Sequence, residues 1–127
     1  MSGPARHNTI DYIELTTTDI ARSEAFYGGV FGWKFQDYGA DYASFDRSSA
    51  GVDGGFRTAA PAKRSAAAEQ SAPAAPLVVL YSSDLKATEE AIVAAGGRVV
   101  VPVFEFPGGR RFHFDDGAGN TLAVWSE

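Results

Sequence analysis

The chain contains no cysteine among its 127 residues. Disulfide bonds, thiolate metal sites and cysteine nucleophiles are therefore excluded. Positive charge is also scarce: 11 lysines and arginines stand against 16 aspartates and glutamates, and the net charge is −5. Nucleic acids and anionic membranes both attract a basic face, so this balance argues against either as a partner and favours a neutral or cationic small ligand.

Long hydrophobic runs are missing too. No apolar stretch approaches the length of a membrane span, and residues 1–9, MSGPARHNT, lack the apolar core of a signal peptide. We expect these nine residues to form a polar N-terminal tail, and the protein to be cytoplasmic. Hydrophobic residues make up 45% of the chain and charged residues 21%, which is typical of a globular domain.

The most informative feature that is present is an internal repeat. Residues 10–35 read IDYIELTTTDIARSEAFYGGVFGWKF, and residues 75–100 read APLVVLYSSDLKATEEAIVAAGGRVV, without a gap between the aligned copies. Each copy holds a strand-like apolar run, an aspartate that can cap a helix, an amphipathic segment, a glycine and a second strand-like run. The repeat predicts one supersecondary unit built twice, in which each unit buries its open face against the other.

The first copy begins with an alternating segment, Ile10–Thr16. Tyr12 and Glu14 lie on one face of the predicted strand, and Ile13 and Leu15 lie on the other. The remaining elements expected in this copy are a helix that starts at Thr18 or Asp19, strands at Trp33–Tyr38 and Asp41–Asp46, a loop at Arg47–Ala50 and a Gly-rich strand at Gly51–Arg57.

The second copy predicts the same order of elements. They are a strand at Leu77–Ser82, a helix from Ser83 or Asp84 to about Ala95, and strands at Arg98–Phe106, Arg110–Asp115 and Thr121–Ser126. Pro102 marks an edge or a bulge in the long strand. Residues 58–76 are rich in alanine and proline and are expected to be a linker, with a helical turn or two at Ala62–Gln70 as the alternative.

Together these segments predict an α+β fold of two tandem βαβββ modules. The first module covers residues 10–57, and the second covers residues 77–127. With the tail and the linker, the two modules account for the whole chain.

At this point the chain resembles the vicinal oxygen chelate superfamily, the group of glyoxalase I, bleomycin-resistance proteins and extradiol dioxygenases. The resemblance covers residues 10–126 and rests on residues 19–23, Phe26-Tyr27, Phe31-Gly32-Trp33, Ala95-Gly96-Gly97 and residues 114–120. The family's usual final turn is Asp-Pro-Asp/Glu-Gly-Asn, and Gly117-Ala118 replaces its proline and acid here. The resemblance implies curved mixed sheets around a cleft and a homodimer, with modules paired within one chain or between two.

Enzymes of that superfamily hold a divalent metal in the cleft, on His and Glu side chains of the first and last strands of each module. The corresponding positions in this chain are Tyr12, Leu77, Ala123 and Gly54 or Gly55. Leucine, alanine and glycine offer no side-chain lone pair to a cation, and a neutral phenol is a poor ligand. We therefore expect no metal at the usual site and no cofactor, with a divalent metal at another site as the alternative.

Two side chains are candidates for catalysis. Glu14 needs a charged or hydrogen-bonding partner if it faces a cleft, and Arg111 is one candidate partner. His113, on the face of its strand opposite Phe112 and Phe114, titrates near neutrality and can act as an acid or a base. Several aromatic residues indicate a cleft for a flat or apolar ligand, although core packing is the alternative for each of them. The expected ligand-binding residues are Tyr12, Glu14, Tyr42, Tyr81, Phe106, Arg111, His113 and Trp125.

The function expected on these grounds is metal-independent binding of a small molecule, in the manner of the bleomycin-resistance proteins. One alternative is a glyoxalase- or dioxygenase-like enzyme with a partial or relocated metal site, for which Glu14, Glu105 and His113 are candidate ligands. A structural module that binds a protein partner is a further alternative, because this fold hosts many functions.

Overall fold

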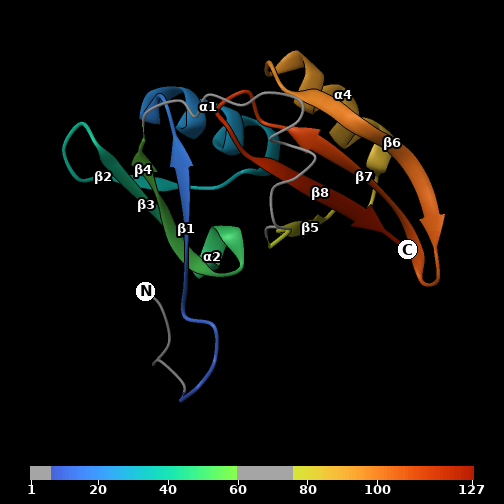
Figure 1. The fold of residues 1–127 in the computed structure, drawn as a ribbon, viewed down its shortest axis with the longest axis horizontal. Helices are drawn as coiled ribbons and strands as arrows, with labels where there is room; N and C mark the ends of the chain where they lie inside the picture. Colours follow the sequence, from blue (N-terminus) through green and yellow to red (C-terminus); the bar gives the residue numbers. More distant parts are fainter. Residues whose placement is uncertain (1–6, 60–75) are drawn as a thin grey trace, which may run out of the picture.

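The computed structural model describes residues 7–59 and 76–127, which form two four-stranded sheets (Figure 1). Residues 1–6 of the expected tail and residues 60–75 of the expected linker, including Ala62–Gln70, lie outside the described residues. Each module contains a strand, a long helix and three further strands in chain order, and its four strands form one sheet. The predicted pair of βαβββ modules is therefore confirmed.

The first module comprises β1 (Tyr12–Thr17), α1 (Ile20–Phe31), β2 (Phe35–Asp37), β3 (Tyr42–Phe45), α2 (Arg47–Ala50) and β4 (Asp53–Thr58). The strand order is β1-β4-β3-β2, with β1 parallel to β4 and the other pairs antiparallel. Strand β4 extends to Thr58, which pairs with Thr17, so the first position of the expected linker belongs to the sheet.

The second module comprises β5 (Val79–Tyr81), α4 (Leu85–Ala94), β6 (Arg98–Phe106), β7 (Gly109–Asp115) and β8 (Thr121–Ser126). Its strand order, β5-β8-β7-β6, repeats the topology of the first module, and β5 is parallel to β8. The pairing of β6 with β7 shifts register between Val99 and Phe104. Pro102 lies inside this stretch, at the edge of the sheet, where a missing backbone N–H is tolerated.

Helix α1 has the start and stop signals that its sequence indicates. The Asp19 carboxylate accepts a hydrogen bond from the backbone N–H of Arg22 at 3.2 Å, and Gly32 ends the helix with φ 74°. Asp84 caps α4 in the same way, through the N–H of Ala87 at 3.1 Å.

Within the described part of the chain, no helix is long and apolar enough to cross a membrane.

The prediction of a loop at Arg47–Ala50 is wrong, because these residues form the short helix α2. The Asp46 carboxylate accepts from the N–H of Ser48 at 3.0 Å, and Gly51 closes the turn with φ 88°. A cap and a left-handed glycine therefore bracket one helical turn. Four residues are too few to display a helical period, so the pattern of apolar residues gave no sign of it.

The core is shared between the two modules. Helix α1 covers the first sheet, where the ring centroids of Tyr27 and Phe56 are 5.1 Å apart. The same helix reaches the second sheet, where Phe26 stacks on Phe114 of β7 at 6.0 Å. Helices α1 and α4 contact each other and lie near each other at one edge of the molecule (Figure 1). Burial of α1 thus depends on both modules.

Polar contacts join the modules around the turn between β7 and β8. Arg22 of α1 donates to the carbonyl oxygen of Gly117 at 2.7 Å, and the side-chain amide of Asn120 donates to the carbonyl of Thr16 at 2.7 Å. The turn at residues 116–120, which joins β7 to β8, therefore holds the second module against α1 and β1.

Candidate functional site

A polar cluster occupies the exposed face of the first sheet. Arg57 forms an ion pair with Glu14 at 3.1 Å, and Tyr42 donates a hydrogen bond to Glu14 at 3.2 Å. The hydroxyl groups of Tyr12 and Tyr42 are also hydrogen-bonded to each other. Burial and these two neighbours, Tyr12 before Glu14, raise the pKa of Tyr42, so its phenol stays protonated. Glu14 therefore finds its charge partner in its own module, and not in Arg111.

The glycines of β4 make room for the chain's own side chains. A Cβ on Gly55 would collide with the ring and hydroxyl of Tyr42, and a Cβ on Gly54 would collide with the ring of Phe45 and the carbonyl of Ile13. These glycines allow Tyr42 and Phe45 to lie across the strand on opposite faces.

A second cluster, which we call the aromatic face, lies on the exposed side of the second sheet. Its members are Tyr81 of β5, Trp125 of β8, Phe104 and Phe106 of β6, and Arg111 and His113 of β7. The Trp125 ring contacts Tyr81 at 5.1 Å and Phe106 at 6.4 Å between centroids. The Arg111 guanidinium lies over Phe106 and Phe104, at 5.6 and 5.2 Å from the ring centroids. The six side chains therefore form one continuous surface.

Two polar atoms of the aromatic face are buried without a hydrogen bond. They are Nε of Arg111 and Nε2 of His113, and neither has a partner among the residues that the structure describes. Burial, followed by the charge of Arg111, lowers the pKa of His113 below 6.5, so the imidazole is neutral at pH 7. Native proteins pair most buried polar groups, so these two atoms indicate a missing partner.

The expected ligand-binding residues fall into two groups. Tyr12, Glu14 and Tyr42 belong to the polar cluster, and Tyr81, Phe106, Arg111, His113 and Trp125 belong to the aromatic face. No hydrogen bond, ion pair or ring contact joins the two groups within residues 7–59 and 76–127.

Sequence reasoning missed Arg57 and Phe104. Gly55 pairs with Glu14 in the structure, so Arg57, two residues further along β4, lies on the face of Glu14, and no pattern within either strand encodes that pairing. A signal was present for Phe104, because it lies two residues before Phe106 in a part of β6 that has no register shift.

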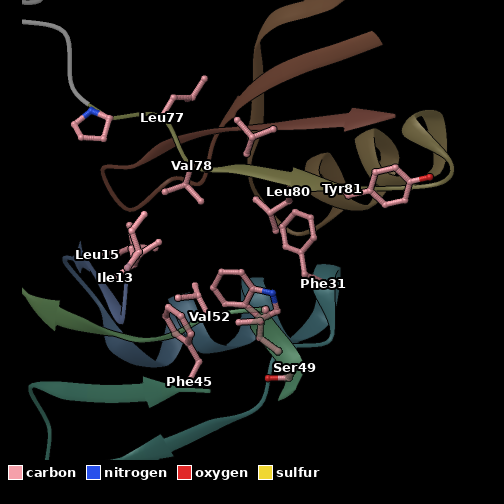
Figure 2. Close-up of a pocket in the computed structure, with 16 residues that line it drawn as sticks. Ile13, Leu15, Phe31, Phe45, Ser49, Val52, Leu77, Val78, Leu80 and Tyr81 are labelled. Carbon is pink, nitrogen blue, oxygen red and sulfur yellow. The ribbon is translucent and has the colours of Figure 1, made fainter. Parts of the chain in front are cut away.

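A hollow of about 710 Å³ opens between the modules, next to the aromatic face. Figure 2 shows Ile13 and Leu15 of β1 and Phe45 of β3 on one side of it, and Val78, Leu80 and Tyr81 on the other. Its lining is largely apolar and includes Phe31 and Val52. The hollow therefore borders the face of β1 opposite Glu14, and of the expected ligand-binding residues only Tyr81 lines it.

The residues at the superfamily's metal positions do not fit a cation. Tyr12 is hydrogen-bonded to Tyr42, Gly55 has no side chain, and Ala123 is fully buried opposite Val79. Nowhere in the described residues do three His, Asp or Glu side chains gather in a way that could hold a metal. Glu14, Glu105 and His113, the candidate ligands of a relocated metal site, do not come together either. Glu105 is opposite Arg110 in the sheet register and therefore lies on the face opposite His113.

The family model described as the Glyoxalase/Bleomycin resistance protein/Dioxygenase superfamily matches residues 9–124. The chain belongs to this superfamily. Its fold matches that of FosX, a fosfomycin resistance protein from Listeria monocytogenes, with a TM-score of 0.70 and 16% identity over 96% of this chain and 95% of the other. A glyoxalase-related enzyme from Fulvimarina pelagi matches with a TM-score of 0.69 and 18% identity, over 94% and 88% of the two chains.

Two curated relatives are similar in sequence. "Putative glyoxylase CFP32" of Mycobacterium bovis is 27% identical over 94% of this chain, which spans 46% of the length of that protein. A glyoxylase-like domain-containing protein of Didymella fabae is 30% identical over 93% of both chains.

Proposed function

We propose that the chain is a metal-independent small-molecule-binding protein of the glyoxalase/bleomycin-resistance type, with its ligand held against the aromatic face. The observation that carries this proposal is the accessibility of that face: Tyr81 is 52% exposed, and the rings of Trp125, Phe104 and Phe106 are only partly buried. Exposed aromatic rings that touch one another on a sheet form a platform for a flat or apolar compound.

The hollow supports the same proposal. Its volume of about 710 Å³ lies within the range typical of ligand pockets, about 300–1,000 Å³. Tyr81 belongs both to the lining of the hollow and to the aromatic face. A compound stacked on Tyr81 can therefore extend an apolar part toward Val79, which lies on the same face of β5 and also lines the hollow.

The names of the curated relatives favour a glyoxalase-like reaction as the competing function. In this superfamily such a reaction relies on a metal held by the first and last strands of each module. Tyr12, Leu77, Gly55 and Ala123 stand at those positions, and this donor set argues against that chemistry in this chain.

Titration with N-phenyl-1-naphthylamine, a neutral aromatic probe that fluoresces in apolar sites, tests the proposal. We expect saturable binding that a chelator leaves unchanged, and an affinity about three- to tenfold weaker in Tyr81→Ala and Trp125→Ala, because a stacked ring contributes on the order of 1 kcal/mol. Tyr38→Ala removes an equally exposed tyrosine away from the face and serves as the control. Absence of saturable binding, or binding that requires added zinc, nickel, manganese or iron, would overturn the proposal.

We also propose that the protein is a homodimer. Large apolar side chains are exposed on both sheets, among them Tyr12, Val79, Val101 and Val103, each 38–45% exposed. A second copy of the chain can bury such side chains. The polar cluster and the aromatic face of one chain do not meet, so a second copy can close a cleft over either. Light scattering after size exclusion should give about 27 kDa, twice the 13.5 kDa of the chain, and a value near 13.5 kDa would contradict the dimer.

A further inference from the structure

We propose that the ligand carries a carboxylate, or an anion of the same planar shape, which binds Arg111 and His113 while its aromatic body stacks on Phe106 and Trp125. This ligand class rests on the proposed function, because it uses the same aromatic face.

Arg111 provides the charge. Arg111 is only partly buried, and its Nε–H, which has no acceptor, becomes accessible to a ligand when the side chains around it shift. The guanidinium lies over the rings of Phe104 and Phe106, which fix its plane. A planar guanidinium presents parallel N–H groups, and a carboxylate accepts two of them at once. Arg111 is therefore already oriented for a carboxylate.

His113 provides a second contact to the same anion. It lies two residues from Arg111 on the same face of β7, and its ring is 5.9 Å from that of Phe104. The imidazole is neutral at pH 7, because burial and then the charge of Arg111 lower its pKa. A neutral imidazole with its proton on Nε2 donates one hydrogen bond, and the buried Nε2 of His113 can donate it to a carboxylate oxygen when the side chains around it shift.

Neighbouring acidic groups are already engaged. Asp115 pairs with Arg98 at 3.8 Å, and Glu127 accepts a hydrogen bond from Tyr81 at 2.7 Å. Across the described ranges, no carboxylate lies within ion-pair distance of Arg111, whereas Arg57 in the first module is paired with Glu14 at 3.1 Å. The net charge of −5 favours a neutral or cationic ligand in general, but Arg111, a cation, is the one charged side chain among the six of the aromatic face.

The shape of the ligand follows from the rings. Trp125 and Phe106 contact each other at 6.4 Å between centroids, and Arg111 is the neighbour of both, over Phe106 and opposite Trp125 in the strand register. A ligand that stacks on these rings has its polar end beside Arg111. An aromatic carboxylate meets both requirements, and a neutral apolar compound leaves the two buried nitrogens without acceptors.

Calorimetric titration at pH 7.5 with 2-naphthoate and its neutral analogue 2-naphthamide tests the ligand class. We expect the carboxylate to bind at least tenfold more tightly than the amide. Arg111→Gln should reduce this preference to less than about twofold, and Arg111→Lys, which keeps the charge but loses the planar fork, to about threefold. Arg110→Gln is the matched control, since Arg110 is exposed on the opposite face of β7, and it should keep the full preference. Circular dichroism establishes that each variant is folded. If Arg111→Gln does not fold, the wild-type protein is used instead: a shift of the His113 ring resonances on adding 2-naphthoate places the anion beside His113.

The outcomes separate the ligand class from the proposed function. Equal affinities for the two naphthalene compounds overturn the ligand class and leave small-molecule binding intact. Failure of both compounds to bind overturns the ligand class, and it overturns the proposed function as well when N-phenyl-1-naphthylamine also fails to bind. A preference that persists in Arg111→Gln, or that Arg110→Gln loses equally, also overturns the ligand class. Light scattering adds a further outcome. If Arg111→Gln dissociates a dimer and the wild type binds 2-naphthoate no more tightly than 2-naphthamide, the partner of Arg111 is a carboxylate of a second copy of the chain. The proposal of a small-molecule anion then fails.

Discussion

At the residue scale, the buried carboxylate of Asp116 connects the two modules. It is 2% exposed and accepts hydrogen bonds from the Tyr27 hydroxyl at 2.8 Å and from the backbone N–H groups of Ala118 and Asn120. We expect Tyr27→Phe to lower the free energy of unfolding by about 1–3 kcal/mol, because a buried charged acceptor loses a donor. Urea denaturation measures this loss. Tyr38→Phe, at a site 58% exposed, should change stability by less than about 0.5 kcal/mol. Equal losses in the two variants would contradict the role of Asp116.

A second residue-scale prediction concerns the carboxyl groups of Glu24 on α1 and Asp37 on β2. Partial burial, followed by a hydrogen bond and repulsion from Asp37, raises the pKa of Glu24 from 4.5 to about 7. A raised pKa favours the protonated form in the fold, so the stability contributed by this proton is present below about pH 4.5 and is lost as the pH rises through 7.

We therefore expect Glu24→Gln to be more stable than the wild type at pH 8 and to lose this advantage toward pH 4.5. The difference should stay below about 1 kcal/mol, because solvent around a partly exposed carboxyl screens the repulsion. Urea titrations at the two pH values measure it, and in an Asp37→Asn background the effect should shrink to the part that burial alone contributes. An advantage of the same size at both pH values would rule out proton uptake by Glu24 as the cause.

How much of the site the sequence could reveal depends on how local the signal is. Strand alternation placed Glu14 with Tyr12 and placed Arg111 with His113, and the structure has both pairs on shared faces. The partner of Glu14 could not be predicted in the same way. Whether Arg57 or Arg111 meets it depends on which strand pairs with β1 and on how the two sheets are arranged, and no local pattern encodes either.

At the scale of elements, Gly29 and Gly54 of the first module have opposite roles. Gly29 lies inside α1 with open space where a Cβ would be, so Gly29→Ala should stabilise the protein by about 0.5–1 kcal/mol through lower backbone entropy of the unfolded chain. Gly54 of β4 lies against the Ile13 carbonyl and the Phe45 ring. Gly54→Ala should destabilise by about 1–3 kcal/mol, because the added methyl group has no space. Thermal denaturation of both variants checks the signs, and a shift in the same direction would contradict this account.

The limits of sequence-based prediction at this scale follow from element length. Caps at Asp19 and Asp84 and the left-handed Gly32 are local features, and they located both long helices. Trp33 was expected to begin a strand, but the strand begins at Phe35 and Trp33 is 8% exposed in the core. Packing against Tyr27, at 4.8 Å between ring centroids, occupies this aromatic residue outside the regular ladder, and alternation alone cannot show such packing.

At the scale of the whole molecule, the duplicated topology was visible in the repeat, whereas the shared core was not. The offset between the copies predicts two similar modules and says nothing about which helix faces which sheet. In the structure α1 packs on both sheets, through Tyr27 and Phe56 on one and Phe26 and Phe114 on the other. A single layer of aromatic residues therefore belongs to both modules.

This arrangement predicts that the two modules unfold together. Trp33 lies in the core of the first module and Trp125 on the second sheet, so variants Trp33→Phe and Trp125→Phe each leave one fluorescent reporter, since the chain has two tryptophans. In both variants, the urea midpoint from tryptophan fluorescence should coincide with the midpoint from far-ultraviolet circular dichroism, as expected for a two-state transition. Comparison within each variant cancels the effect of the substitution on stability. Separate midpoints would mean that one module unfolds while the other persists, which a core that both modules share through α1 does not permit.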